Sequence, residues 1–131
     1  ETHGVEAFYE HFLFKNTLVQ LNYTRTLGEN LIDVAGDEAG VALRFHQSPV
    51  TASVRGSYRA DHRINVFSLD TFATETVNED GYFRVDATIG YKVRPNVELY
   101  AKLENAFSEN YVDGGYRQPG FKSYFGTRVE F

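Results

Sequence analysis

Apolar and polar residues alternate along most of this chain with a period of two. The alternation predicts seven β-strands, over residues 4–14, 17–27, 38–46, 51–68, 82–92, 96–108 and 121–131. In the last segment Phe121, Phe125 and Val129 fall on one face, while Lys122 and Arg128 fall on the other. The apolar residues are not gathered into helical stripes. We therefore expect an all-β fold.

The connections between these strands alternate between short and long. Residues 15–16, 47–49 and 94–95 form short turns, whereas the segments 28–37, 69–81 and 109–120 are long and polar. In an antiparallel up-and-down sheet successive connections lie at opposite ends, so all the short turns should share one rim. Bacterial outer-membrane barrels have this asymmetry, with short periplasmic turns and longer external loops. A soluble sandwich has no reason to sort its loops in this way.

The two faces of the strands fit an antiparallel transmembrane β-barrel. In the strand at 96–108, Leu99 and Leu103 alternate with Lys102 and Glu104, and the strands at 51–68, 82–92 and 121–131 repeat the pattern. We expect the apolar face to meet lipid and the polar face to line a water-filled lumen. The first strand does not fix its own orientation, because Phe8 lies between two glutamates.

Aromatic and charged residues refine this picture. Aromatic residues near the two rims resemble the girdles at membrane interfaces, and they are Phe45, Tyr91 and Phe131 at one rim and Phe83, Phe107 and Phe121 at the other. The expected lumen charges have mixed sign, which favours polar contacts to a plug over a charge-selective pore, and they are Arg55, Arg59, Arg84, Asp86, Lys102, Glu104 and Arg128. For any single one, structural pairing is the expected role.

Composition excludes several classes of protein. With no cysteine the chain has no disulfide, thiolate metal site or cysteine nucleophile. A net charge of -5, with 13 dispersed Lys and Arg residues, argues against nucleic acid as a partner. No apolar run approaches the roughly 20 residues of a spanning helix. A membrane role must therefore depend on strands.

The end of the chain resembles the final hairpin of TonB-dependent outer-membrane receptors. The matching residues are Leu103-Glu104-Asn105-Ala106-Phe107-Ser108, then Tyr111, then Tyr116-Arg117-Gln118-Pro119-Gly120-Phe121. The family has an Asn-Leu-Phe-Asp-like segment, a Tyr, a Pro-Gly and a terminal strand ending in Phe. Here Ala106 stands for the common Leu and Ser108 for the common Asp. The resemblance covers about the last 29 residues closely and the others only in strand rhythm.

The resemblance implies that residues 1–131 are the C-terminal strands of a 22-stranded barrel closed around an N-terminal plug. Such receptors take up scarce ligands such as iron-siderophore complexes or cobalamin, driven by the inner-membrane TonB complex. The plug and the TonB-contacting segment are absent from these residues. Implied partners are outer-membrane lipid, lipopolysaccharide, a small-molecule or metal-chelate ligand, and the β-barrel assembly machinery, which would recognise Phe131. Since seven strands cannot close this barrel, we expect upstream strands or further copies to complete it.

Candidate ligand-binding residues lie in the external loop 109–120. Tyr111, Tyr116, Arg117 and Gln118 offer aromatic faces and hydrogen-bonding groups, and Gly114-Gly115 permits a sharp, movable turn. In the alternative interpretation the two tyrosines are interface anchors and Arg117 contacts lipopolysaccharide phosphate.

No pattern predicts catalysis, a resident metal or a cofactor. His3, His11, His46 and His62 lack metal-ligand spacing, and we interpret them as solvated or rim residues. The acidic loop residues Asp33, Asp37, Glu38, Glu79 and Asp80 lack the oxygen spacing of a calcium loop. The sequence leaves three other classes open: a passive porin or small structural barrel, an outer-membrane hydrolase, and a soluble lipid-binding barrel.

Overall fold

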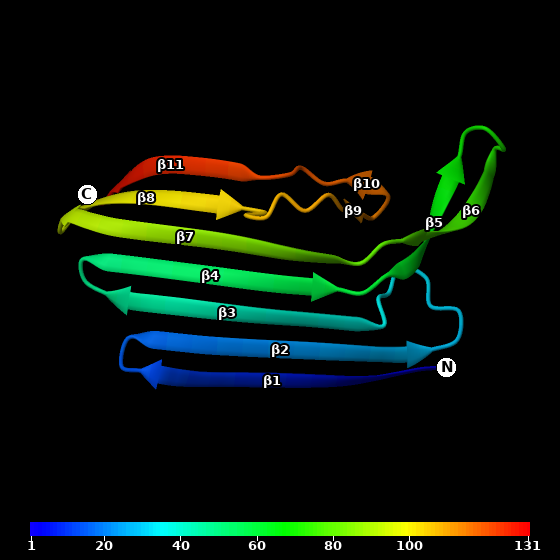
Figure 1. Cartoon of the computed structure of the whole chain (residues 1–131), viewed down its shortest axis with the longest axis horizontal. Helices are drawn as coiled ribbons and strands as arrows, with labels where there is room; N and C mark the ends of the chain where they lie inside the picture. The colour runs from blue at the N-terminus through cyan, green and yellow to red at the C-terminus, as the bar shows by residue number, and fades with distance from the viewer.

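The computed structural model describes all 131 residues and contains one large antiparallel sheet. Its neighbouring strands follow the chain, in the order β1-β2-β3-β4-β7-β8-β11 (Figure 1). Their bounds are β1 Thr2–Phe14, β2 Thr17–Gly28, β3 Asp37–Gln47, β4 Val50–Arg59, β7 Tyr82–Arg94, β8 Val97–Glu104 and β11 Lys122–Val129. No helix could cross a membrane. The predicted all-β antiparallel fold is confirmed.

Two small hairpins extend from one end of this sheet. β5 (His62–Ser68) pairs with β6 (Ala73–Glu79), and the two-residue strands β9 (Val112–Asp113) and β10 (Tyr116–Arg117) pair with each other. Figure 1 shows both hairpins at the end that carries the long connections, while the short turns and the C-terminus lie at the opposite end. The predicted sorting of short and long connections is therefore confirmed.

The prediction of a single strand over 51–68 was wrong, and part of the long connection predicted over 69–81 is a strand. The chain leaves the large sheet after Arg59, where β4 ends opposite Tyr82 of β7, and residues 62–79 form the β5–β6 hairpin. Gly81, just before β7, lies very close to the end of β4. A Cβ at this position would be 2.6 Å from the carbonyl oxygen of Arg59, so only glycine fits. The strand predicted to reach residue 108 also ends earlier, at Glu104.

The register of the strands defines two faces, which we call the apolar face and the polar face. Leu99 pairs with Tyr91 on one side and Thr127 on the other, so these residues share the apolar face. Lys102 pairs with Thr88 and Tyr124, which lie on the polar face. The predicted parity of the later strands agrees with this register.

The register also settles the orientation of β1. Tyr9 lies opposite Leu21 on the apolar face, while Phe8 and Glu10 lie opposite Asn22 and Gln20 on the polar face. Phe8 is therefore an aromatic residue on the polar face, as is Phe12, which pairs with Leu18. The sequence pattern of β1 did not contain this information, because both of its faces carry apolar residues.

The sheet has almost no core of its own. Only 8 of 131 residues are buried, and Phe125 on the apolar face is 79% exposed. Both β1 and β11 pair along one edge only. A soluble domain of this size would bury much of its apolar surface. The apolar face and the outer edges of β1 and β11 are thus uncovered within these residues.

Candidate functional site

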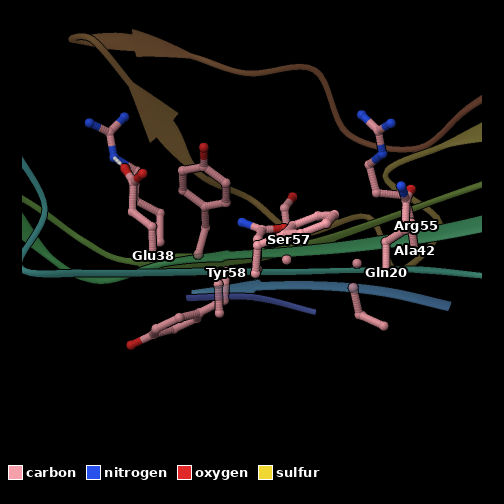
Figure 2. Close-up of a pocket in the computed structure, with 14 residues that line it drawn as sticks. Gln20, Glu38, Ala42, Arg55, Ser57 and Tyr58 are labelled. Atoms are coloured by element: carbon pink, nitrogen blue, oxygen red, sulfur yellow. Dashed lines mark ion pairs between the residues drawn. The ribbon is translucent and has the colours of Figure 1, made fainter. Parts of the chain in front are cut away.

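The polar face carries a hollow of about 400 Å³ above β2, β3 and β4. Small residues of β3 and β4 form its floor, namely Gly40, Ala42 and Ser57, and longer side chains surround them. A Cβ at Gly40 would collide with the Asn22 side chain, so the absence of a side chain at Gly40 leaves the space that the Asn22 amide occupies. Figure 2 shows Glu38 and Arg55 at opposite ends of the hollow and Tyr58 on the other face.

One end of the hollow is closed by a network around Arg59. Its Nε lies 3.1 Å from Glu38 Oε1, and its Nη1 donates to Asp113 Oδ1 over 2.9 Å. A third nitrogen, Nη2, donates to the carbonyl oxygen of Asp33 over 3.3 Å. A single guanidinium thus joins β3, the loop before it and the β9–β10 segment, using the several donors that arginine offers.

Three further ion pairs lie on the polar face. Arg84 donates to Asp86 over 2.9 Å, Arg128 donates to Glu98 over 3.0 Å, and Lys102 pairs with Glu104. Structural pairing, the role expected of these residues, therefore describes most of them. Arg55 differs, because it makes no ion pair.

The long connections form one packed unit, which we call the loop layer: residues 29–36, the β5–β6 hairpin and residues 105–121. Most of the buried residues of the chain lie in it, and they are Ala35, His62, Ile64, Glu79, Asn105 and Tyr111. In addition, the backbone N–H of Asp33 donates to the carbonyl oxygen of Arg63 over 2.7 Å. The loops are therefore tied to one another as well as to the sheet.

A buried carboxylate joins the β5–β6 hairpin to the segment 105–121. Glu79 accepts hydrogen bonds from the backbone N–H groups of Gly114 at 3.2 Å and Gly115 at 2.9 Å. His62 Nε2 lies 3.2 Å from the same carboxylate, and the two side chains are only 4% and 2% exposed. Both glycines have positive φ, 62° and 80°, which favours glycine. We call this arrangement the Glu79 clamp.

The interpretation of His62 as a solvated or rim residue was wrong, and Glu79, which the sequence places in an ordinary solvated loop, is buried as well. Both are buried because β5 and β6 bring them opposite each other and the turn at Gly114-Gly115 covers them. The signal available in the sequence was the matching alternation of Ile64 and Val66 with Val77, which is typical of a hairpin. No group of three or more metal-ligating side chains exists in the structure.

The four candidate residues of the loop 109–120 occupy different environments. Tyr111 is buried and stacks on Tyr82 with ring centroids 4.1 Å apart. Tyr116 is 77% exposed, and Arg117 donates to the Asn110 side chain over 3.3 Å. Tyr111 thus packs within the loop layer, while Tyr116 and Arg117 lie on its surface.

Asn105 holds the two ends of this loop together. Its side-chain Nδ2 donates to the carbonyl oxygens of Glu109 at 2.9 Å and Pro119 at 3.2 Å, and its Oδ1 accepts from the Glu109 N–H. Its own N–H donates to Asp86 of β7. An asparagine suits this position because it combines an amide donor and acceptor with a φ of 50°, which it tolerates better than most residues.

Comparison with known proteins finds similarity in structure only. No protein-family model matches the sequence, and no curated protein does. Among solved structures, 99% of the chain superposes on 19% of the ferripyoverdine receptor of the outer membrane of Pseudomonas aeruginosa, with a TM-score of 0.80 and 18% identity. The ferric-catecholate import receptor Fiu from E. coli K12 gives 0.76 and 18%, with 99% of this chain on 21% of that one.

A third similar structure is the siderophore receptor PiuA from Acinetobacter baumannii, with a TM-score of 0.78, 15% identity, and 98% of this chain on 21% of that one. This chain thus spans about a fifth of the length of these proteins. All three are receptors and not enzymes. At these identities the likeness establishes the fold, which is that of part of such a receptor.

Proposed function

We propose that this chain is the C-terminal wall of a TonB-dependent receptor that imports a scarce ligand, such as an iron-siderophore complex, across the outer membrane of a Gram-negative bacterium. The observation that carries the proposal is a single open sheet, polar on one face and apolar on the other, with every long connection at one end. Its fold matches outer-membrane siderophore receptors over 98–99% of the chain.

In this proposal the apolar face meets outer-membrane lipid and the polar face lines the lumen. Further strands continue the sheet from β1 and β11 to complete a 22-stranded barrel, and a plug domain outside these residues contacts TonB. Strands suit this environment because closure pairs every backbone N–H and C=O within lipid. The mixed charges of the polar face support contact with a plug better than a charge-selective pore.

The loop layer would lie outside the cell, where lipopolysaccharide and ligands are met first. Tyr116, Arg117 and Gln118 are the proposed ligand contacts, since they lie on or near its surface, with Tyr111 supporting them from below. Phe131 would serve as the assembly signal at the opposite rim. No cofactor and no covalent chemistry enter this function.

The test is uptake of radiolabelled iron, supplied as a panel of ferric chelates, by cells that carry the full-length gene. The proposal expects that uptake of at least one chelate disappears when either this gene or the TonB gene is deleted. Uptake that needs this gene but not TonB would indicate a passive porin instead. No change for any chelate on deletion of this gene would contradict the iron-chelate function.

A further inference from the structure

The long connection after β8 is tied to the large sheet by one carboxylate, that of Asp86 on β7. Asp86 lies on the polar face, and its Oδ1 accepts from the backbone N–H of Asn105 over 2.9 Å. Beside this bond, the N–H of Ala106 donates to the carbonyl oxygen of Val85 over 2.7 Å. Because β8 ends one residue before Asn105, these two bonds hold the first residues after the strand against β7. They therefore fix the direction in which the loop leaves the sheet.

Asn105 carries this attachment across the loop. Its side-chain Nδ2 donates to the carbonyl oxygens of Glu109 and Pro119, which lie at or near the two ends of the loop 109–120. Asn105 is itself buried, so water competes poorly for these bonds. The N–H that Asp86 accepts and the amide that joins the loop ends thus belong to one residue. A shift of Asn105 would move both ends of the loop together.

A second connection runs from the same oxygen through Arg84. Arg84 Nε donates to Asp86 Oδ1 over 2.9 Å, and Arg84 Nη1 lies 3.5 Å from the Tyr111 hydroxyl oxygen. The carbonyl oxygen of Tyr111 in turn accepts from the backbone N–H of Gln118 over 2.9 Å. Both connections therefore end on residues that directly follow Arg117. The Asp86 and Arg84 side chains are partly shielded from water, with 27% and 33% of their surface exposed.

A loop that is already held in place binds a ligand more tightly than the same loop free to move, because less entropy is lost on binding. The Glu79 clamp holds the turn of the loop 109–120, and Asp86 holds its base. The other hydrogen bonds at the base have neutral acceptors, whereas bonds to a charged acceptor are stronger. Removal of the Asp86 carboxylate should therefore loosen the base of the loop while the turn stays clamped.

We propose that Asp86 is a positioning residue for ligand recognition by the loop 109–120. It contacts no ligand, and through Asn105 and Arg84 it sets the place of the exposed loop side chains. This inference rests on the proposed function and adds to it a residue of the lumen wall that controls affinity. Both donors bond to the same oxygen of Asp86, so an asparagine can keep the acceptor while losing the charge. A role in charge pairing alone would make asparagine as harmful as alanine.

Hydrogen exchange of the purified full-length receptor tests the positional step without any ligand. In Asp86→Ala the amides over 105–111 should exchange roughly tenfold faster or more than in the wild type, because a hydrogen bond to a charged acceptor is lost. Asp86→Asn should stay within about threefold of the wild type. If Asp86→Ala folds poorly, Asp86→Thr replaces it with the same expectation, since threonine suits a strand and carries no charge.

Glu98→Ala is the matched control. Glu98 is also a polar-face carboxylate paired with an arginine, since Arg128 donates to it over 3.0 Å, but it lies beside the short turn at 95–96. Its substitution should leave exchange over 105–111 unchanged. Equal acceleration in Glu98→Ala would show a general loosening of the sheet and would overturn the role of Asp86.

Titration calorimetry on the same variants tests the functional step, with a ferric tris-catecholate and a ferric trihydroxamate as separate probes. For a probe that binds the wild type, Asp86→Ala should weaken binding roughly tenfold, while Asp86→Asn and Glu98→Ala stay within about threefold. Adding Asp86→Ala to Tyr116→Ala with Arg117→Ala should cause little further loss, because the side chains that Asp86 positions are already gone. Losses that multiply would show that Asp86 acts independently of the loop and would overturn its positioning role.

The remaining outcomes separate this inference from the proposed function. If Asp86→Asn is as damaging as Asp86→Ala, Asp86 serves its ion pair with Arg84 and the inference fails. Normal exchange and affinity in a folded Asp86→Ala receptor overturn it as well, and both results leave the receptor function standing. If neither probe binds the folded wild type, the iron-chelate function fails, and the role of Asp86 in recognising such a ligand fails with it.

Discussion

Replacing Glu79 with alanine should release the loop segment 105–121 from the β5–β6 hairpin. The substitution removes the acceptor of two backbone donors, the N–H groups of Gly114 and Gly115, and with it the carboxylate that lies 3.2 Å from His62 Nε2. Hydrogen bonds to a charged group contribute about 1.5–3 kcal/mol each. The net loss is smaller than their sum, because water can hydrogen-bond to the freed N–H groups of the glycine turn once the clamp opens. We therefore expect the loop layer to lose about 2–4 kcal/mol of local stability.

Hydrogen exchange measures this loss directly, because the two glycine amides report on local opening. A loss of about 2–4 kcal/mol corresponds to roughly 30- to 900-fold faster exchange in the peptide covering 109–121 of the full-length receptor. Glu75→Ala is the matched control, since this exposed carboxylate of the same strand accepts only from the Thr71 hydroxyl. Unchanged exchange over 109–121 in Glu79→Ala would refute the clamp.

Three further predictions concern the membrane, assembly and ligand contact. Leu99→Arg on the apolar face should cost roughly 2–4 kcal/mol in unfolding from lipid, whereas Lys102→Ala on the polar face should cost far less, and equal costs would contradict the face assignment. Deleting Phe131 should lower the amount of folded receptor in the outer membrane, measured by heat-modifiable gel mobility; normal amounts would count against an assembly role. Tyr116→Ala combined with Arg117→Ala should weaken ligand binding roughly tenfold, about 1.4 kcal/mol, with normal folded yield, and unchanged affinity would make the loop architectural.

The two faces and the sorting of the loops could be predicted because they depend on local alternation. A strand such as β8 places Leu99 and Lys102 on opposite faces whatever its neighbours are. The exit of the chain from the large sheet after Arg59 could not be predicted in this way, because alternation continues across Ala60 and Asp61 into β5. The end of β4 depends on where β7 begins to pair, which is a contact between distant segments.

The Glu79 clamp escaped prediction for a related reason. Its carboxylate looked solvated because it lies in a polar stretch, and its burial depends on a turn at Gly114-Gly115 that is distant in sequence. Asn105 is the opposite case. The family resemblance marked its position, and the structure supplies the physical reason, which is the bridging of Glu109 and Pro119 across the loop. Arg55 was predicted to face the lumen, but its lack of a partner required the register and side-chain positions.

The most direct test of the central claim is a solvent-accessibility scan of β7 and β8 in the full-length protein reconstituted in lipid. This chain has no cysteine, so single cysteines can be introduced at Thr88, Ile89, Leu99 and Tyr100 and spin-labelled. The account predicts that labels at Ile89 and Leu99 collide mainly with oxygen dissolved in lipid, and that labels at Thr88 and Tyr100 collide mainly with a water-soluble nickel chelate or are shielded by a plug. Accessibility to the nickel chelate at Ile89 and Leu99, or no alternation between neighbours, would contradict the membrane-spanning wall.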